Sequence, residues 1–240
     1  ADLVFAARKF NDETDAKAQS ENRAWTDDER AQYTTMRDSI ASTSASIDRE
    51  NALLAEEAGS LDTVAAITER AMRGELDFTN SLAERVATLA GLDDGVFQRA
   101  GSRIVPTDGV RDLIDAVHAH GGTVGVVSGG FHEMLDPLQP ELGFDLWHAN
   151  RLEVIDGRLT GRTLGAVVDA ETKATMMHSW ARHVGATRTV AIGDGANDLK
   201  MMAAADLGIA FCAKPVVRSS ADIAIDEPNL ALVLPVLGLG

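Results

Sequence analysis

An apolar segment that ends at two glycines and two aspartates constrains the fold of this chain most. The segment runs from Thr189 to Ile192 and is followed by Gly-Asp-Gly-Ala-Asn-Asp, with acids at Asp194 and Asp198. A helix-like run begins at Leu199, directly after the second acid. This order predicts a strand, a tight loop and a helix, with both carboxylates at the loop. Because Mg²⁺ prefers carboxylate and water oxygens, the loop predicts a Mg²⁺ site for phosphate chemistry.

Strands alternate with helices through residues 58–240. Strands are predicted at Thr123 to Val127, Thr189 to Ile192, Leu207 to Phe211 and Asp222 to Ile225, with a hairpin over Asn150 to Thr163 around Asp156-Gly157. Helices are predicted within Asp62 to Gly91, and at Arg111 to His120, Lys173 to Val184 and Leu199 to Ala204. The alternation predicts an α/β fold, with a three-layer sheet of mostly parallel strands. Ligands of such sheets bind beyond the carboxyl ends of the strands.

Each candidate ligand-binding residue also has a plain structural interpretation. Asp194 could form a turn, and Asp198 could cap the helix that follows it. Ser128 and Gly129 end an apolar run and offer a hydroxyl and backbone N–H groups to an anion, but Ser-Gly-Gly after a strand is usually a turn. Lys173 near a helix start opposes the helix dipole, although an isolated lysine is more often on the surface. These residues alone leave both interpretations open.

Net charge and composition exclude some classes of partner. The chain of 240 residues has a formal charge of −15, which argues against a nucleic-acid partner but not against a small anion bound by local positive charge. It has no apolar run of about 18 residues and no N-terminal layout of a signal peptide, so no membrane partner is expected. The single cysteine, Cys212, fits a reducing compartment, and a cytoplasmic location is expected.

Residues 1–57 differ from the rest because they contain no glycine and no proline. Apolar residues recur there every seven positions, at Tyr33, Ile40, Ile47 and Leu54. This spacing predicts a long helix with a narrow apolar seam. Leu3 to Ala18 is also predicted as helix, so a helical hairpin of coiled-coil type is expected. Self-association through residues 26–57 is a further expectation.

Longer strings repeat the residue order of one known family. They are Ala65 to Phe78, Ser81-Leu82 through Arg85-Val86, Val127 to Phe131, Ala149 to Leu152, Gly193 to Asp198 and Ala210 to Pro215. Together they resemble the haloacid dehalogenase superfamily and, more narrowly, its phosphoserine phosphatases, over about residues 55–240. The resemblance implies a helical cap segment at 58–108 and a haloacid dehalogenase-like core at 109–240, in addition to the helical hairpin predicted at 1–57.

The resemblance also implies an activity and a set of roles. The activity is Mg²⁺-dependent hydrolysis of O-phosphoserine, a small phosphorylated amino acid, to serine and phosphate through an aspartyl-phosphate. The implied roles are phosphate binding by Ser128, Gly129 and Asn197, charge neutralisation by Lys173, Mg²⁺ ligation by Asp194, and support of the metal and the lysine by Asp198. Met72, Phe78 and Arg85 would lie in the cap, with Arg85 pairing with the substrate carboxylate.

The chain lacks one part of the family pattern. The family has Asp-x-Asp after its first strand, where the first Asp attacks phosphorus and the second transfers protons. This chain contains no Asp-x-Asp. If Leu3-Val4-Phe5 were that strand, Ala6 would take the nucleophile position and Arg8 the acid–base position, and neither can do that chemistry. An impaired or inactive enzyme is therefore expected, in which Leu3 to Phe10 fills the central strand position, the position is empty, or another chain supplies the strand.

Residues 1–57 have a second resemblance of lower specificity. Ala7 to Asp12, Glu21 to Ala24 and Thr26 to Tyr33 resemble the helical scaffolding segment that precedes tailed-phage major capsid proteins. This implies a junction of two unrelated pieces near residues 50–57, as a natural fusion or an artificial chimera. One alternative function is a non-catalytic assembly or interaction protein. Another alternative is an intact phosphatase whose natural N-terminal part has been exchanged.

Overall fold

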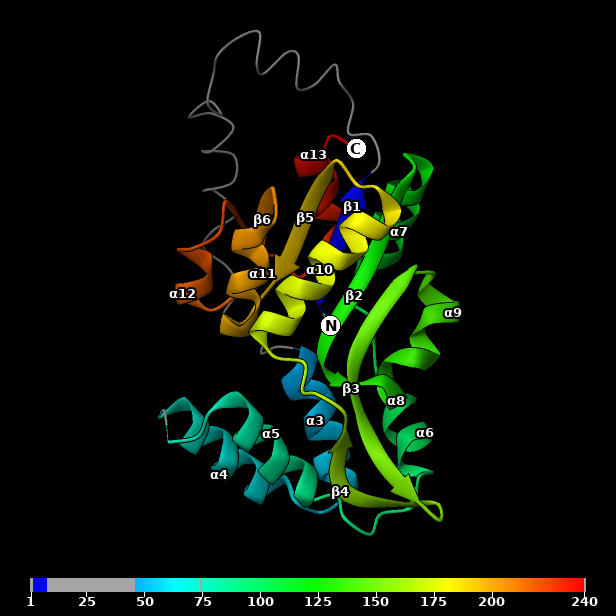
Figure 1. Cartoon of the computed structure of the whole chain (residues 1–240), viewed down its shortest axis with the longest axis vertical. Coiled ribbons are helices and arrows are strands. Elements are labelled where there is room, and N and C mark those ends of the chain that lie inside the picture. Colours follow the sequence, from blue (N-terminus) through cyan, green and yellow to red (C-terminus); the bar gives the residue numbers. More distant parts are fainter. Residues whose placement is uncertain (1, 8–45, 74, 240) are drawn as a thin grey trace, which may run out of the picture.

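The computed structural model describes residues 2–7, 46–73 and 75–239, and in these residues one seven-stranded sheet has the order β4-β3-β2-β1-β5-β6-β7 (Figure 1). The strands are β1 (Asp2–Ala7), β2 (Gly122–Phe131), β3 (Leu146–Ile155), β4 (Arg158–Leu164), β5 (Arg188–Gly193), β6 (Leu207–Phe211) and β7 (Ile223–Ile225). Strands β2, β3, β5, β6 and β7 share one direction, and β1 and β4 run against them. The predicted α/β fold with a mostly parallel sheet is confirmed.

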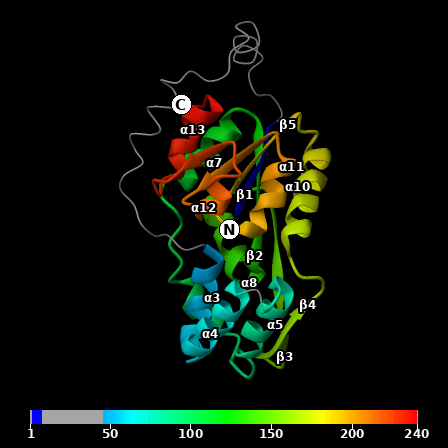
Figure 2. The same cartoon turned by 90° about the vertical axis from the view of Figure 1, so that its left-hand side faces the viewer.

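Helices cover both faces of this sheet. Figure 2 shows α10 (Ala170–Val184) on one side, and α7 (Val110–Ala119) and α13 (Val233–Leu237) on the other. Neighbouring strand residues point to opposite faces, so Ile192 packs into the apolar cluster under α7 and Ala191 into the cluster under α10. The remaining helical elements of the sheet domain are α8 (His132–Leu135), η2 (Asp136–Leu138), α9 (Gln139–Leu142), η3 (Ala196–Asp198), α11 (Leu199–Ala204), α12 (Pro215–Arg218) and η4 (Leu230–Leu232).

A second group of helices, here called the cap, lies beyond the strand ends at one end of the sheet (Figure 1). It consists of α3 (Ser46–Glu57), α4 (Leu61–Met72), α5 (Phe78–Ala87) and α6 (Val96–Gly101). The cap helices bury Leu54, Leu82 and Val96 in a cluster with residues of β3 and β4. Strands β3 and β4 form the predicted hairpin, and its turn residues Asp156 and Gly157 have φ values of 51° and 72°. Such left-handed conformations are what a tight hairpin turn requires.

Strand β1 fills the centre of the sheet and runs antiparallel to both neighbours. Val4 pairs with Gly125 of β2 on one side and with Ala191 of β5 on the other. The prediction of helix from Leu3 to Ala18 is therefore wrong for residues 3–7, because these residues gain two ladders of backbone hydrogen bonds in the sheet. Of the alternatives for the central strand position, the one in which the N-terminal segment fills it is confirmed for Asp2–Ala7.

The predicted helical hairpin lies mostly outside the described residues. Residues 8–45 are not described, whereas Ser46–Glu57 form helix α3 as expected. The boundaries at residues 57 and 108 and self-association through residues 26–57 stay predictions. Among the described residues, no helix is long and apolar enough to cross a membrane.

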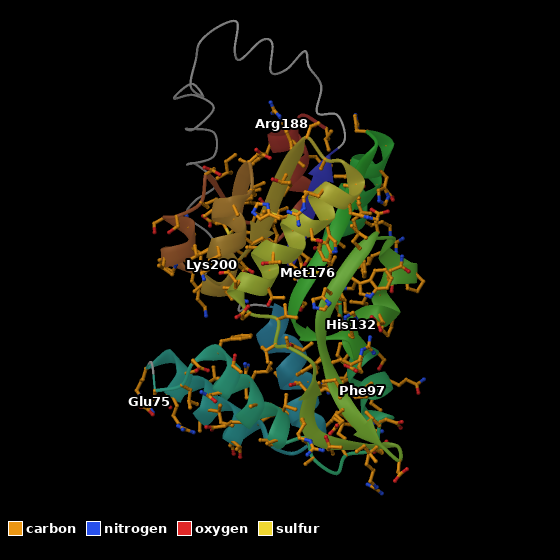
Figure 3. All side chains as sticks on the ribbon, in the orientation of Figure 1. Glu75, Phe97, His132, Met176, Arg188 and Lys200 are labelled. Atoms are coloured by element: carbon orange, nitrogen blue, oxygen red, sulfur yellow. The ribbon has the colours of Figure 1, made fainter. Side chains whose placement is uncertain are left out.

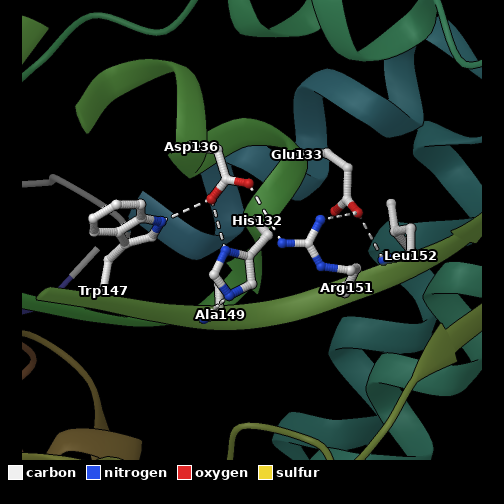
Figure 4. Close-up of polar contacts among 7 residues, drawn as sticks. All are labelled: His132, Glu133, Asp136, Trp147, Ala149, Arg151 and Leu152. Atoms are coloured by element: carbon white, nitrogen blue, oxygen red, sulfur yellow. Dashed lines mark hydrogen bonds and ion pairs between the residues drawn. The ribbon is translucent and has the colours of Figure 1, made fainter. Parts of the chain in front are cut away.

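A polar network fixes α8, the helix that follows β2, against β3 (Figure 4). Asp136 accepts a hydrogen bond from Trp147 Nε1 at 2.8 Å and lies 2.7 Å from Nδ1 of His132. The other ring nitrogen of His132 accepts the backbone N–H of Ala149 at 3.1 Å, so Nδ1 carries the proton and donates to Asp136. Arg151 of β3 approaches the second Asp136 oxygen at 3.4 Å. The end of β2 is thereby held in one position relative to β3.

Glu133 of α8 lies beside this network and bonds to β3. Figure 3 shows Phe97 of the cap on the same side as His132 of α8. Glu133 Oε1 accepts the backbone N–H of Leu152 at 3.2 Å, while Oε2 is buried with no hydrogen-bond partner among the described residues. Burial raises the pKa of the Glu133 carboxyl, and the hydrogen bonds to it only partly oppose this effect.

The central position of β1 predicts that proline is not tolerated there. Val4→Pro removes a backbone donor and clashes in a strand that is bonded on both sides, so we expect the free energy of unfolding to fall by about 3 kcal/mol or more. Thermal unfolding followed by far-UV circular dichroism measures this loss of stability. Val105→Pro, at a position that is 73% exposed outside any helix or strand, is the matched control and should unfold near the unsubstituted chain. Equal melting of the two variants would rule out the central strand.

The buried carboxyl of Glu133 gives a prediction on pH dependence. Because its pKa is raised in the folded state, its ionisation costs stability as pH rises from the unfolded pKa through the folded one. Glu133→Gln keeps an acceptor for Leu152 and removes the charge, so its free energy of unfolding at pH 7 should equal or exceed that of the unsubstituted chain. The gain in free energy of unfolding over the unsubstituted chain should shrink towards pH 4. Urea unfolding of both proteins at several pH values measures this difference.

The matched control for this prediction is Glu141→Gln, at an exposed glutamate of α9. That variant should show no such pH-dependent gain. A clear loss of stability in Glu133→Gln at pH 7 would mean that the contact with Arg151, 3.8 Å away, outweighs the cost of burial.

Candidate functional site

The loop after β5 is organised by one buried carboxylate. Asp198 has 0% exposure, and its Oδ2 accepts the backbone N–H groups of Asp194 at 3.2 Å and Gly195 at 3.0 Å. A Cβ atom at Gly193 would lie 2.4 Å from Cβ of Asp198, and one at Gly195 would lie 2.3 Å from Oδ1 of Asn197. Close approach therefore requires glycine at position 193, whereas the contact at position 195 involves only the end of the Asn197 side chain. Asp198 holds the N-cap position of α11, as that interpretation predicts, but its side chain makes no cap hydrogen bond to this helix and bonds to the preceding loop instead.

Lys173 joins this loop to α10. Its Nζ donates to Oδ1 of Asp198 at 2.7 Å, and both side chains are fully buried. The interpretation of Lys173 as a surface lysine is therefore wrong. Asp169 begins α10 by accepting the backbone N–H of Thr172 at 2.8 Å, and this hydrogen bond holds the pKa of Asp169 below its usual range. The capped helix start thus fixes the turn from which Lys173 projects.

Ser128 lies at an irregular point of β2. The β2–β3 register shifts between Val127 and Phe131, and Ser128, Gly129 and Gly130 occupy the shift. Ser128 is 1% exposed, and its Oγ accepts the backbone N–H of Gly130 at 3.0 Å. The segment is therefore an irregular, bulged part of the strand, with a hydroxyl at its start.

The sheet brings these segments together at the carboxyl ends of its parallel strands, a region called the sheet edge below. Ser128 follows the straight part of β2, and Asp194 follows β5, on either side of β1. Ala174, next to Lys173, packs in the same apolar cluster as Val127 and Ala191, which precede the two loops. The structure thus gathers Ser128, Gly129, Lys173, Asp194, Asn197 and Asp198 at the carboxyl ends of parallel strands, where α/β sheets bind ligands.

Asp194 lies in a half-buried position within this edge. Its backbone oxygen accepts the N–H of Lys214 at 3.3 Å. Burial raises the pKa of the Cys212 thiol to about 11, and the negative charges of Asp226 and then Asp194 add to this effect. No group of three or more potential metal ligands of the His, Cys, Asp or Glu type is found in the part of the chain that the structure describes.

The predicted cap residues form a separate group. Arg85 of α5 is 8% exposed, and its Nε donates to the backbone oxygen of Ser81 at 3.2 Å. Phe78, the first residue of α5, is half-buried and packs against the cap cluster. Met72 is the last residue of α4, and its side chain lies outside the described residues.

The reversed direction of β1 corrects one expectation about the site. Ala6 pairs with Thr123 and Thr189, near the starts of β2 and β5, so it does not occupy the nucleophile position. Arg8 lies outside the described residues. At the other end, Asp2 pairs with Val127, directly before Ser128, so its backbone lies at the site edge.

Asn150 is the residue of this region to which the sequence assigned no role. Its side chain is 2% exposed and bonds to the backbone of two other segments. No spacing in the sequence signals it, because both of its partners are backbone groups, which every residue type carries.

Comparison with known proteins agrees with this architecture. The model of the haloacid dehalogenase-like hydrolase family matches residues 35–203. Phosphoserine phosphatase of Streptococcus thermophilus is 52% identical over 187 residues, which are 77% of this chain and 87% of that protein. The phosphoserine phosphatase of Streptomyces coelicolor is 51% identical over 78% of this chain, which spans only 46% of that longer protein.

A solved structure described as a phospho-aspartyl intermediate analogue of phosphoserine phosphatase superimposes with a TM-score of 0.73. It is 40% identical and aligns with 78% of this chain and 90% of its own. The family model and the relatives both extend over more than two thirds of the chain. The chain therefore belongs to the haloacid dehalogenase-like hydrolases and, within them, to the phosphoserine phosphatase family.

Proposed function

We propose that the sheet edge is a phosphoserine-binding site of the Mg²⁺-dependent phosphoserine phosphatase type, with impaired or absent turnover. The observation that carries this proposal is the buried Lys173–Asp198 pair, which ties α10 to the Asp194 loop. The pair holds an ammonium at the carboxyl ends of β2 and β5, where it offsets the charge of an anionic ligand. The names of the relatives support phosphoserine as that ligand.

Each residue at the edge has a task that its chemistry suits. The Ser128 hydroxyl and the backbone of Gly129 donate hydrogen bonds to phosphate oxygens, and the Lys173 ammonium offsets their charge. Asn197 donates its amide N–H to the same phosphate. Asp198 holds Lys173 and the backbone of the Asp194 loop in place.

Asp194 is the residue proposed to hold Mg²⁺. A carboxylate on a loop after a strand supplies the hard oxygen that this ion requires. When bound, the ion neutralises charge on the phosphate and orients it. The described residues hold no cluster of three ligands, so water and phosphate oxygens would complete the coordination.

The cap residues are proposed to recognise the serine part of the ligand. Arg85 offers a planar guanidinium, which pairs with a carboxylate through two parallel hydrogen bonds. Phe78 and Met72 provide apolar surface beside it. The binding of phosphate at the sheet edge and of carboxylate in the cap would select phosphoserine over other phosphomonoesters.

Turnover is the part of the family function that this chain is proposed to lack. A related structure is described as a phospho-aspartyl intermediate analogue, which requires an aspartate that attacks phosphorus. The chain has no Asp-x-Asp, and Asp198 is committed to Lys173 and two backbone groups. The comparisons do not favour the alternative of a non-catalytic assembly protein. A cytoplasmic location remains part of the proposal.

The first test measures Mg²⁺ binding and hydrolysis together. Titration calorimetry of the full chain with Mg²⁺ in the presence of inorganic phosphate should show binding that Asp194→Asn weakens by about tenfold or more, because a charged ligand is lost. Phosphoserine hydrolysis should stay near the buffer rate, since removal of a covalent nucleophile costs many powers of ten. Asp222→Asn, on a surface turn before β7, is the charge-matched control. Rapid turnover that Asp194→Asn abolishes would overturn the proposed loss of activity.

The second test examines recognition of the carboxylate. Arg85→Lys keeps the charge but loses the paired geometry, so phosphoserine affinity should fall by about tenfold, as expected for hydrogen bonds to a charged group. Phosphoethanolamine, which has no carboxylate, should bind both proteins equally. Equal loss for both ligands would show that Arg85 supports the cap rather than the ligand.

A further inference from the structure

The side chain of Asn150 joins two segments of the sheet edge that are far apart in the sequence. It projects from β3, and Nδ2 donates to the backbone oxygen of Gly129 at 2.8 Å. Its Oδ1 accepts the backbone N–H of Val168, also at 2.8 Å. A carbonyl can only accept and an N–H can only donate, so these two partners fix the orientation of the amide.

The first partner belongs to the Ser128–Gly130 bulge of β2. This bulge occupies the shift in register between β2 and β3, where the regular ladder does not hold the backbone. The amide of Asn150 replaces a ladder bond there, because it comes from the neighbouring strand and donates to the Gly129 oxygen. The bulge is thereby held in place from the β3 side.

The second partner lies at the start of α10. Val168 is fully buried and comes directly before Asp169, the residue that caps the helix. One helical turn later, the backbone N–H of Lys173 bonds to the oxygen of Asp169 at 3.0 Å. The position of Val168 therefore sets where the helix begins and from which point Lys173 extends.

We propose that Asn150 is a positioning residue that sets the distance between the Ser128–Gly130 bulge and Lys173, and so the phosphate affinity of the sheet edge. The inference rests on the proposed phosphate site. The amide is 2% exposed, so water does not replace either bond when it is lost. A side chain that fails to donate leaves the Gly129 oxygen unsatisfied, and one that fails to accept leaves the Val168 N–H unsatisfied. Of the side chains with this shape, only an amide or a protonated carboxyl makes both bonds.

This property of the carboxyl group provides the experiment. Asn150→Asp has nearly the same shape, but the ionised form cannot donate to Gly129 and places a charge against its oxygen. The protonated form donates to Gly129 and accepts from Val168, as the amide does. Burial raises the pKa of a carboxyl, so acidification should restore both bonds.

The measurement is the dissociation constant of inorganic phosphate for the full chain, by titration calorimetry with Mg²⁺ present, at pH 5.5 and pH 8. Phosphate changes its own charge over this range, so each variant is compared with the unsubstituted chain at the same pH. Asn150→Asp should bind about tenfold more weakly at pH 8, as for one lost buried hydrogen bond, and recover most of the loss at pH 5.5. Gln98→Glu, which adds one charge on the exposed face of α6, should match the unsubstituted chain at both pH values.

A second variant keeps the proposal testable if the first does not fold at pH 8. Asn150→Ala lacks both groups at every pH and should bind phosphate weakly at both pH values, without recovery. Binding by Asn150→Asp that equals the unsubstituted chain at pH 8, or a loss that acidification does not reverse, would overturn the positioning role. So would unchanged binding by a folded Asn150→Ala. Failure of the unsubstituted chain to bind phosphate at all would instead overturn the proposed function on which the inference rests.

Discussion

The buried ion pair between Lys173 and Asp198 is the contact on which the rest of the sheet edge depends. Two fully buried charges are tolerated only when they meet each other and find further hydrogen bonds, and Asp198 also accepts two backbone N–H groups of its own loop. This requirement explains Gly193, since a Cβ atom at that position would strike the side chain of Asp198. It also explains why α10 has a firm N-terminal cap: the lysine must leave the helix at one defined point.

Much of this edge could be predicted from the sequence, because its signals are local. The strand, the loop with Asp194 and the helix Leu199–Ala204 lie within one short stretch, and the structure shows the helix with those bounds. Burial of Lys173 could not be derived from its own neighbourhood. Its partner is 25 positions further along the chain, and only the packing of α10 brings the two together. The role proposed for Asn150 was missed for a related reason, since its partners are backbone groups without a sequence signature.

The direction of β1 is the feature that sequence patterns could not supply. An apolar strand fits the centre of a sheet equally well in either direction, because alternation of side chains is the same when read backwards. The same six residues also fit a helical pattern, since apolar positions in so short a run match both periods. Backbone pairing with two neighbours decided in favour of the strand. Because β1 is reversed, Ala6 lies at the end of the strand away from Ser128. The segment therefore fills the central position without supplying a nucleophile to the site.

The central position of β1 has a consequence for the order in which the fold can form. Val4 is synthesised before both of its partners, Gly125 and Ala191. The middle of the sheet therefore cannot close until residue 191 has left the ribosome, and until then β2 has an open edge on that side. Pairing over such long loops is slow, and open edges favour association with other chains. Strand β1 is thus made before its partners but inserted after them, and the yield of folded protein should depend on how well the nascent chain is protected in the interval.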